Sequence, residues 1–219
     1  MINALNDNLS GKYATIAWHK IIFILIISAL SGCSIFAPQP TEISIEETHF
    51  NWSQIKSKIQ QQNHWSLIGK IGIRTPQDSL TIAINQWLQQ NDNFEIELSS
   101  TFFGLGASSL KGNNQHLTLT ESGEDPIYSE QPNILMESAL GFPLPITHLT
   151  YWVKGLPAPN LLAKIEFNSQ GLPTTIWQDQ WQLQLSKYTL VDNIPLPQKI
   201  KLEHNNTRII LAIKKWKLL

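Results

Sequence analysis

Side chains that could carry out acid–base or metal chemistry are spread thinly along this chain of 219 residues. The six histidines include no pair spaced i, i+2 or i, i+4, and no group of His, Cys, Asp and Glu has zinc or calcium spacing. Glu95 and Glu97 fall on one face of a predicted strand, where two carboxylates could share acid–base work. We favour instead the interpretation that these two glutamates lie on the solvated face of the strand, opposite Phe94, Ile96 and Leu98. We therefore expect no enzyme, no bound metal and no cofactor, although an active site assembled from distant loops stays open.

Two glycine-containing segments fall short of known catalytic or phosphate-binding motifs. The segment Gly69-Lys70-Ile71-Gly72 lacks the Walker pattern, so we expect a strand whose backbone approaches its neighbours closely. Residues 104–108 (GLGAS) lack the pattern of a nucleophile elbow. With 16 Lys+Arg against 17 Asp+Glu, the chain has no basic field for phosphates, which argues against a nucleic-acid partner.

The most unusual segment is apolar. Phe102, Phe103 and Leu105 lie in a predicted turn that also contains Gly104 and Gly106. Turns normally carry polar residues because they face water. These side chains could fold back to cap the core, or at least one could project into solvent as a wedge for a membrane or an apolar ligand.

Cys33 is the only cysteine, which excludes an internal disulfide and an all-cysteine metal site. It follows a ten-residue apolar run, residues 21–30, with Lys20 before it, as in a secretory signal peptide. Ten residues rise only about 15 Å as a helix, which is too short to span a bilayer. The segment Leu30-Ser31-Gly32-Cys33 resembles the lipobox of bacterial lipoproteins, in which the cysteine is acylated and becomes the first mature residue.

This likeness divides the chain into three parts. We expect residues 1–32 to be a lipoprotein signal peptide, residues 33–44 a tether after the lipidated cysteine, and residues 45–219 a single domain. Ser34, rather than an aspartate, follows the cysteine, which implies sorting to the outer membrane, facing the periplasm. Several acyl chains would make that anchorage stable.

Hydrophobic periodicity indicates which elements build the domain. Residues 44–47 match a capping box, and Trp52, Ile55 and Ile59 share one face, which predicts a helix at about 46–61. From His64 onwards apolar residues alternate with polar ones in about ten runs. Strict alternation is typical of antiparallel strands with one buried face.

The strand series is interrupted between about 132 and 155. Pro132 can open a helix that Gly141 ends, and Pro145 can open a second that Gly155 ends. Helices this short are unstable alone, so their apolar faces must lie on the sheet. The periodicity thus predicts a mainly β fold with α-helices, in which a curved antiparallel sheet carries helices across its concave side.

Several segments occur in the order found in a known family. After the lipobox and the Trp-containing helix come residues 69–74 (GKIGIR), 86–90 (QWLQQ), 102–104 (FFG) and 141–157 (GFPLPITHLTYWVKGLP). The whole mature chain resembles the LolB family of outer-membrane lipoproteins, and residues 141–157 are the most specific part of the likeness.

The resemblance implies both a fold and a function. The fold would be an unclosed antiparallel β half-barrel of about 10–11 strands with a helical lid over a hydrophobic cavity. The protein would accept lipoproteins from the periplasmic carrier LolA, hold their acyl chains in the cavity, and insert them into the outer membrane. Its partners would be that carrier, the cargo lipoproteins and outer-membrane phospholipid, and we expect a monomer. No bond is made or broken in such a transfer.

The resemblance also assigns roles to residues. Cys33 would carry the acyl anchor, and Phe102, Phe103 and Leu105 would form a membrane-insertion loop. Phe103 stands where the family has a protruding hydrophobic residue, although Phe-Phe-Gly replaces the family's frequent Pro-Leu-Gly. Candidates for the acyl-chain cavity come from periodicity, and either face of each strand could be the inner one: Leu80, Ile82, Ile84, Phe94, Ile96, Leu98, Ile134, Leu135, Leu149 and Trp152.

Two other functions stay open at this point. One is an outer-membrane lipoprotein that binds a different small apolar ligand or scaffolds an envelope complex. The other is an anchored hydrolase of envelope polymers, which would need a cluster of titratable side chains in a cleft.

Overall fold

The sheet and helices of this protein come from a computed structural model that describes residues 48–99 and 107–219. Three helices lie in this part of the chain: α2 (Trp52–Gln61), α3 (Pro132–Leu140) and α4 (Ile146–Trp152). The eleven strands are β1 (His64–Arg74), β2 (Ser79–Gln90), β3 (Asn93–Leu98), β4 (Ser108–Gly112), β5 (Leu117–Glu121), β6 (Ile127–Ser129), β7 (Lys164–Phe167), β8 (Pro173–Gln178), β9 (Trp181–Val191), β10 (Ile194–His204) and β11 (Thr207–Leu218).

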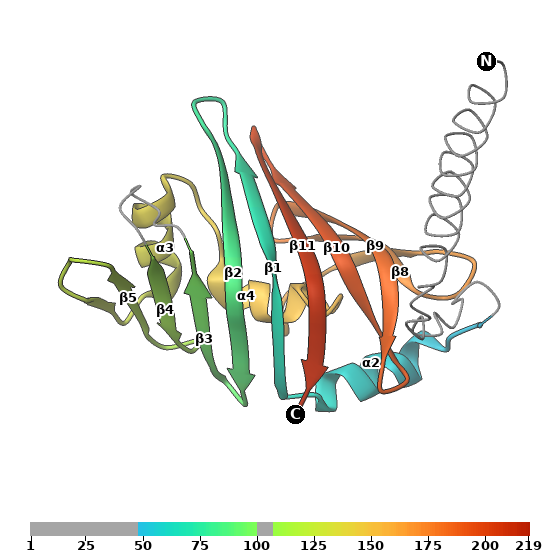
Figure 1. The fold of residues 1–219 in the computed structure, drawn as a ribbon. Helices are drawn as coiled ribbons and strands as arrows, with labels where there is room; N and C mark the ends of the chain where they lie inside the picture. Colours follow the sequence, from blue (N-terminus) through green and yellow to red (C-terminus); the bar gives the residue numbers. More distant parts are fainter. Residues whose placement is uncertain (1–47, 100–106) are drawn as a thin grey trace, which may run out of the picture. The chain divides into compact units, whose positions relative to one another are not determined.

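All eleven strands form one antiparallel sheet in the order β6-β5-β4-β3-β2-β1-β11-β10-β9-β8-β7 (Figure 1). The first and last strands, β1 and β11, pair in the middle of the sheet. The two edges are β6 and β7, so the sheet stays unclosed within the described residues. This confirms the predicted fold class, a mainly β protein built on an unclosed antiparallel sheet with helices.

The alternation seen in the sequence correctly predicts which strand residues are buried. In β3, Phe94, Ile96 and Leu98 are buried while Glu97 is exposed. In β9, Trp181 and Leu183 are buried on one face in the same way. One buried face per strand leaves the sheet with a single apolar surface, which the helices cover.

One end of the sheet is formed by tight turns and is called the upper rim here. It carries the β1–β2 turn at residues 75–78, the β8–β9 turn at 179–180 and the β10–β11 turn at 205–206. Asp179 and Gln180 both have positive φ, as a two-residue type I′ hairpin requires. The opposite end carries α2 and the carboxyl terminus (Figure 1).

The first helix begins later than predicted. Residues 48–51 are not helical, and the Asn51 side chain caps the helix by accepting a hydrogen bond from the backbone N–H of Gln54 at 3.3 Å. The predicted capping box at residues 44–47 lies outside the described residues. The expected apolar stripe is present, since Ile55 and Ile59 are buried.

The two predicted helices between 132 and 155 are confirmed, although α4 ends at Trp152 rather than at Gly155 and one side chain was misplaced. Pro132 begins α3, and Gly141 ends it with φ of 76°, a left-handed C-cap. The buried face of α3 carries Leu135, Met136 and Ala139. Ile134, predicted on the apolar side, is 60% exposed. Successive helix residues are about 100° apart, so Ile134 points away from that face.

Candidate functional site

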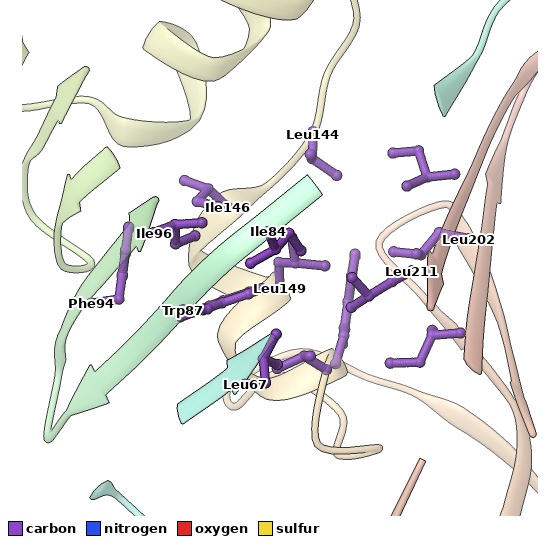
Figure 2. Close-up of a cluster of buried hydrophobic side chains, with 14 of the residues drawn as sticks. Leu67, Ile84, Trp87, Phe94, Ile96, Leu144, Ile146, Leu149, Leu202 and Leu211 are labelled. Carbon is purple, nitrogen blue, oxygen red and sulfur yellow. The ribbon is translucent and has the colours of Figure 1, made fainter. Parts of the chain in front are cut away.

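An apolar pocket lies between the sheet and the helices α3 and α4. Figure 2 shows Ile146 and Leu149 of α4 near Ile84 and Trp87 of β2. The lining residues are all hydrophobic and come from β1–β4, α3, α4, β10, β11 and the α3–α4 connection: Ile71, Ile73, Ile84, Trp87, Ile96, Leu98, Leu110, Met136, Leu140, Leu144, Ile146, Leu149, Leu202, Ile209 and Leu211.

The space left inside this pocket is small. Its volume is about 40 Å³, little more than the share of one water molecule in the liquid, which is about 30 Å³. Pockets that hold drug-sized ligands measure roughly 300–1,000 Å³. The side chains of α3 and α4 therefore fill most of the surface that the sheet offers.

Four of the ten predicted cavity residues line this pocket: Ile84, Ile96, Leu98 and Leu149. The other six lie elsewhere. Ile82, Phe94, Leu135 and Trp152 are buried in the surrounding core, and Leu80 is half-buried against it. Ile134 lies on the exposed side of α3 and contributes nothing to the pocket.

Sequence reasoning missed the pocket residues that come from distant parts of the chain. Ile71 and Ile73 of β1 lie close to Leu202 of β10 and to Ile209 and Leu211 of β11 in the pocket wall. The alternation of Ile209 and Leu211 was visible, but the pairing of β1 with β11 that brings these strands together was not. Met136 and Ile146 could have been found from the i, i+3, i+4 spacing of the two helices.

Helix α4 is tied to the sheet by a buried hydrogen-bond network around Gln178. The Gln178 Oε1 accepts from Trp152 Nε1 at 2.8 Å and from the backbone N–H of Ala158 at 2.7 Å. The Gln178 Nε2 donates to the carbonyl oxygens of Ala158 at 2.9 Å and Leu161 at 3.2 Å. Gln178 is only 3% exposed, so these four bonds satisfy a polar group that would otherwise be costly to bury.

Lys154, just after α4, makes a second link from this helix to another element. Its Nζ donates to the carbonyl oxygen of Gln62 at 3.0 Å and to that of Ile59 at 3.5 Å, at the carboxyl end of α2. A cation is favoured there because the last carbonyls of a helix lack intrahelical partners. Burial nevertheless lowers the pKa of Lys154 to about 8, because it removes water from around the ammonium.

His148 connects α4 to the β8–β9 turn less securely. Its Nδ1 lies 3.3 Å from Asp179 Oδ2, but the geometry does not make a hydrogen bond and leaves this buried nitrogen unpaired. Its ring packs edge-on against Trp152 at 5.5 Å between centroids. Burial lowers the pKa of His148, and the Asp179 carboxylate opposes that shift.

The carboxylates considered for acid–base chemistry face away from the pocket. Glu95 forms an ion pair with Lys111 at 2.6 Å on the solvated face of the sheet. Across residues 48–99 and 107–219, no three His, Cys, Asp or Glu side chains gather closely enough to hold a metal ion. Nor does any helix there have the length and apolar character needed to cross a membrane.

Four of the predicted site residues cannot be placed. Cys33, the predicted acyl anchor, and Phe102, Phe103 and Leu105, the predicted membrane-insertion loop, lie outside the described residues. Their roles remain predictions.

Comparison with known proteins identifies the family. The family model for "Outer membrane lipoprotein LolB" matches residues 63–216. The LolB of Stutzerimonas stutzeri (strain A1501) is 34% identical over 187 residues, which cover 85% of this chain and 89% of that protein. The LolB of Chromohalobacter salexigens is 34% identical over 196 residues, covering 90% of this chain and 89% of that protein. The LolB of Pseudomonas fluorescens (strain Pf-5) is 33% identical over 198 residues, covering 90% of this chain and 95% of that protein.

The family model covers more than half of the chain, including the helices α3 and α4 and all strands except the last two residues of β11. The relatives extend the similarity over most of the remainder. The chain belongs to the LolB family of outer-membrane lipoproteins.

Proposed function

We propose that this protein is an outer-membrane-anchored receptor for lipoproteins, attached through acylated Cys33 and facing the periplasm. It accepts lipoproteins from the carrier LolA, holds their acyl chains against the apolar face of its sheet, and releases them into the outer membrane. Membership of the LolB family supports the location and the receptor role. The observation that carries the proposal is the pocket of fifteen hydrophobic side chains between that face and the helices α3 and α4.

Acyl chains need such a surface because each CH₂ group moved into water costs about 0.8 kcal/mol. A pocket lining without polar groups gives the acyl chains an apolar environment similar to the interior of the membrane that receives them. Transfer from carrier to receptor then requires only that the receptor bind the chains more tightly, so no cofactor or energy source is needed at this step.

A pocket of about 40 Å³ cannot hold an acyl chain, so the helices must separate from the sheet. Helix α4 is held by the Trp152–Gln178 bond and by Lys154. The side chain of Asn133 in α3 is bonded only weakly to Thr147 of α4, at 3.3–3.4 Å. We therefore propose that α3 moves away first and uncovers the pocket, while α4 stays on the sheet.

The test is a transfer assay with a soluble form that lacks residues 1–32 and carries Cys33→Ala. This form is mixed with purified carrier loaded with a tagged lipoprotein, and the protein that co-purifies with the lipoprotein is identified. Movement to the soluble form is expected. If the lipoprotein stays on the carrier while the soluble form is folded, the receptor role is contradicted and a small-ligand module becomes the better explanation.

A second variant tests the loop. Phe103→Glu should leave uptake from the carrier intact and impair release into vesicles, because a charged residue cannot enter the bilayer interior. Normal release by a folded Phe103→Glu protein would remove this loop from the mechanism.

A further inference from the structure

Two leucines on the connection between α4 and β7 are exposed to an unusual degree. Leu162 is 98% exposed and Leu161 is 46% exposed. Apolar side chains gathered on the surface of a folded domain commonly mark a contact with another molecule or with a membrane.

The exposure is imposed by the buried network described above. The Gln178 side chain holds the loop at two points, through both backbone groups of Ala158 and through the carbonyl oxygen of Leu161. With the backbone fixed on a buried glutamine, the two leucine side chains are held in an outward position. The loop thus presents a preorganised apolar tip and has no need to order itself on contact.

The tip lies at the upper rim of the sheet. Gln178 is the last residue of β8, directly before the β8–β9 turn, and it bonds Leu161. Leu161 and Leu162 therefore share the upper rim with the β8–β9 turn.

The chain outside the described residues is long enough to bring this rim to the membrane. Phe50 joins the opposite end of the sheet, where its backbone N–H donates to the carbonyl oxygen of Gln170 at 2.8 Å. The longest strands have 12 residues, or about 40 Å. The fifteen residue-to-residue steps from Cys33 to Thr48 span at most about 54 Å when extended. An acyl anchor at Cys33 thus permits the upper rim to rest on the bilayer.

The side chains beside the tip suit a phospholipid surface. Lys164 is exposed, lies 4.3 Å above the ring of Trp177, and pairs with Glu166 at 3.2 Å. Lysine and tryptophan are typical of the boundary between headgroups and acyl chains, where the stem or ring is apolar and the tip is polar. Lys164 and Glu166 together carry no net charge, so this pair does not favour a charged protein partner over lipid.

We propose that Leu161 and Leu162 form a second membrane contact, which inserts into the acyl-chain region of the phospholipid leaflet. The proposal rests on the proposed anchorage at Cys33 and adds to it a fixed orientation, with the upper rim facing the bilayer. Two separated contacts would prevent the domain from tumbling on its tether, so that a lipoprotein leaving the pocket meets lipid at once.

The experiment uses the mature, acylated chain in vesicles of phosphatidylethanolamine and phosphatidylglycerol. Leu162→Cys is labelled with an environment-sensitive fluorophore, and lipids with a nitroxide on the acyl chain serve as quenchers. The matched control is Leu219→Cys, since Leu219 is also an exposed leucine, 56% exposed, but lies at the opposite end of the sheet. Leu161→Cys is a second reporter should the first variant fold poorly.

We expect the label at position 162 to shift to the blue and to lose intensity with the acyl-chain quencher, while the label at 219 does neither. Equal behaviour of the two labels, either both in water or both quenched, would overturn the proposal. A blue shift that needs added carrier, or that follows protein concentration without vesicles, would also overturn it in favour of a protein partner or a second copy.

The wild-type chain separates this proposal from the anchorage on which it rests. Acylation blocks the thiol of Cys33, the only native cysteine, so wild-type protein should take up no label. Labelling of the wild type would contradict the anchorage alone. The position-162 signal, after subtraction of the wild-type signal, still decides whether the leucine contacts lipid.

Discussion

Replacing Gln178 tests whether one buried amide holds α4 and the loop after it on the sheet. Gln178→Ala removes the acceptor for Trp152 Nε1 and for the backbone N–H of Ala158. Trp152 is completely buried and Ala158 is 3% exposed, so both donors would be left without a partner away from bulk water.

The magnitude follows from these two groups. A buried donor that loses its partner costs about 1–3 kcal/mol. Two such donors give about 2–6 kcal/mol, and a water molecule that enters the space of the removed amide would recover part of this. We expect the free energy of unfolding to fall by about 3 kcal/mol, or the Tm by about 6–12 °C at this chain length.

The assay is urea unfolding of a form that lacks residues 1–32 and carries Cys33→Ser. The control is Gln184→Ala, which removes an exposed glutamine from the neighbouring strand β9 and should change the free energy of unfolding by less than about 0.5 kcal/mol. The denaturant slope should stay the same in both variants. If Gln178→Ala is no less stable than Gln184→Ala, the network does not hold α4. The outward position of Leu161 and Leu162 would then need another explanation.

Three further predictions concern Lys154, His148 and the glycines of β1. Because the folded chain releases the Lys154 proton near pH 8 and the unfolded chain near 10.5, the free energy of unfolding should rise between these pH values by at most about 3 kcal/mol. Urea titrations should show no such rise in Lys154→Met, and parallel pH profiles would contradict the burial argument. Because the pKa of His148 is lowered in the folded chain, the unfolded chain binds the imidazole proton more readily below pH 6.5. The free energy of unfolding should therefore fall with acidification in that range, and should fall less in His148→Asn. Equal acid sensitivity of the two proteins would exclude His148 as the cause. Gly69→Ala should lower the free energy of unfolding by more than about 2 kcal/mol, because the new Cβ would collide with the backbone oxygen of Ala212. Gly72→Ala places its Cβ no nearer than 4.0 Å to any atom and should change that free energy by less than about 0.5 kcal/mol. Thermal melts compare the two variants, and equal effects would refute the close approach at Gly69.

The sequence predicts the strands well because burial on one face has a period of two. Phe94 and Ile96 lie on one face of β3 and Glu97 lies on the other, and the geometry of a strand alone requires this. The same reasoning predicted a solvated role for Glu95, which the structure pairs with Lys111. Local patterns were sufficient here because each depends only on neighbouring residues.

The lining of the pocket could not be predicted in the same way. Ile82 and Ile84 alternate on the same face of β2, yet only Ile84 reaches the pocket. No local pattern distinguishes the two positions, because residues from other elements decide where the pocket lies. The contributions of β10 and β11 depend on the pairing of strands from the two ends of the domain.

The start of α2 shows the same limit. The sequence predicts a cap at residues 44–47, whereas the observed helix is capped by Asn51. Phe50 is held outside the helix by its bond to the carbonyl oxygen of Gln170, 120 positions further along the chain. A contact across that separation cannot be read from the local sequence around the helix.

The unclosed sheet gives this protein a property that a closed barrel lacks. In a closed barrel, strand number and stagger fix the circumference, so the interior has one size. Here β6 and β7 are not paired with each other in the described part of the chain, and no ladder of hydrogen bonds has to break for these edges to move apart. If the protein holds acyl chains as proposed, the unpaired edges would let the sheet spread, so that the narrow space between sheet and helices could widen to match the number of chains bound.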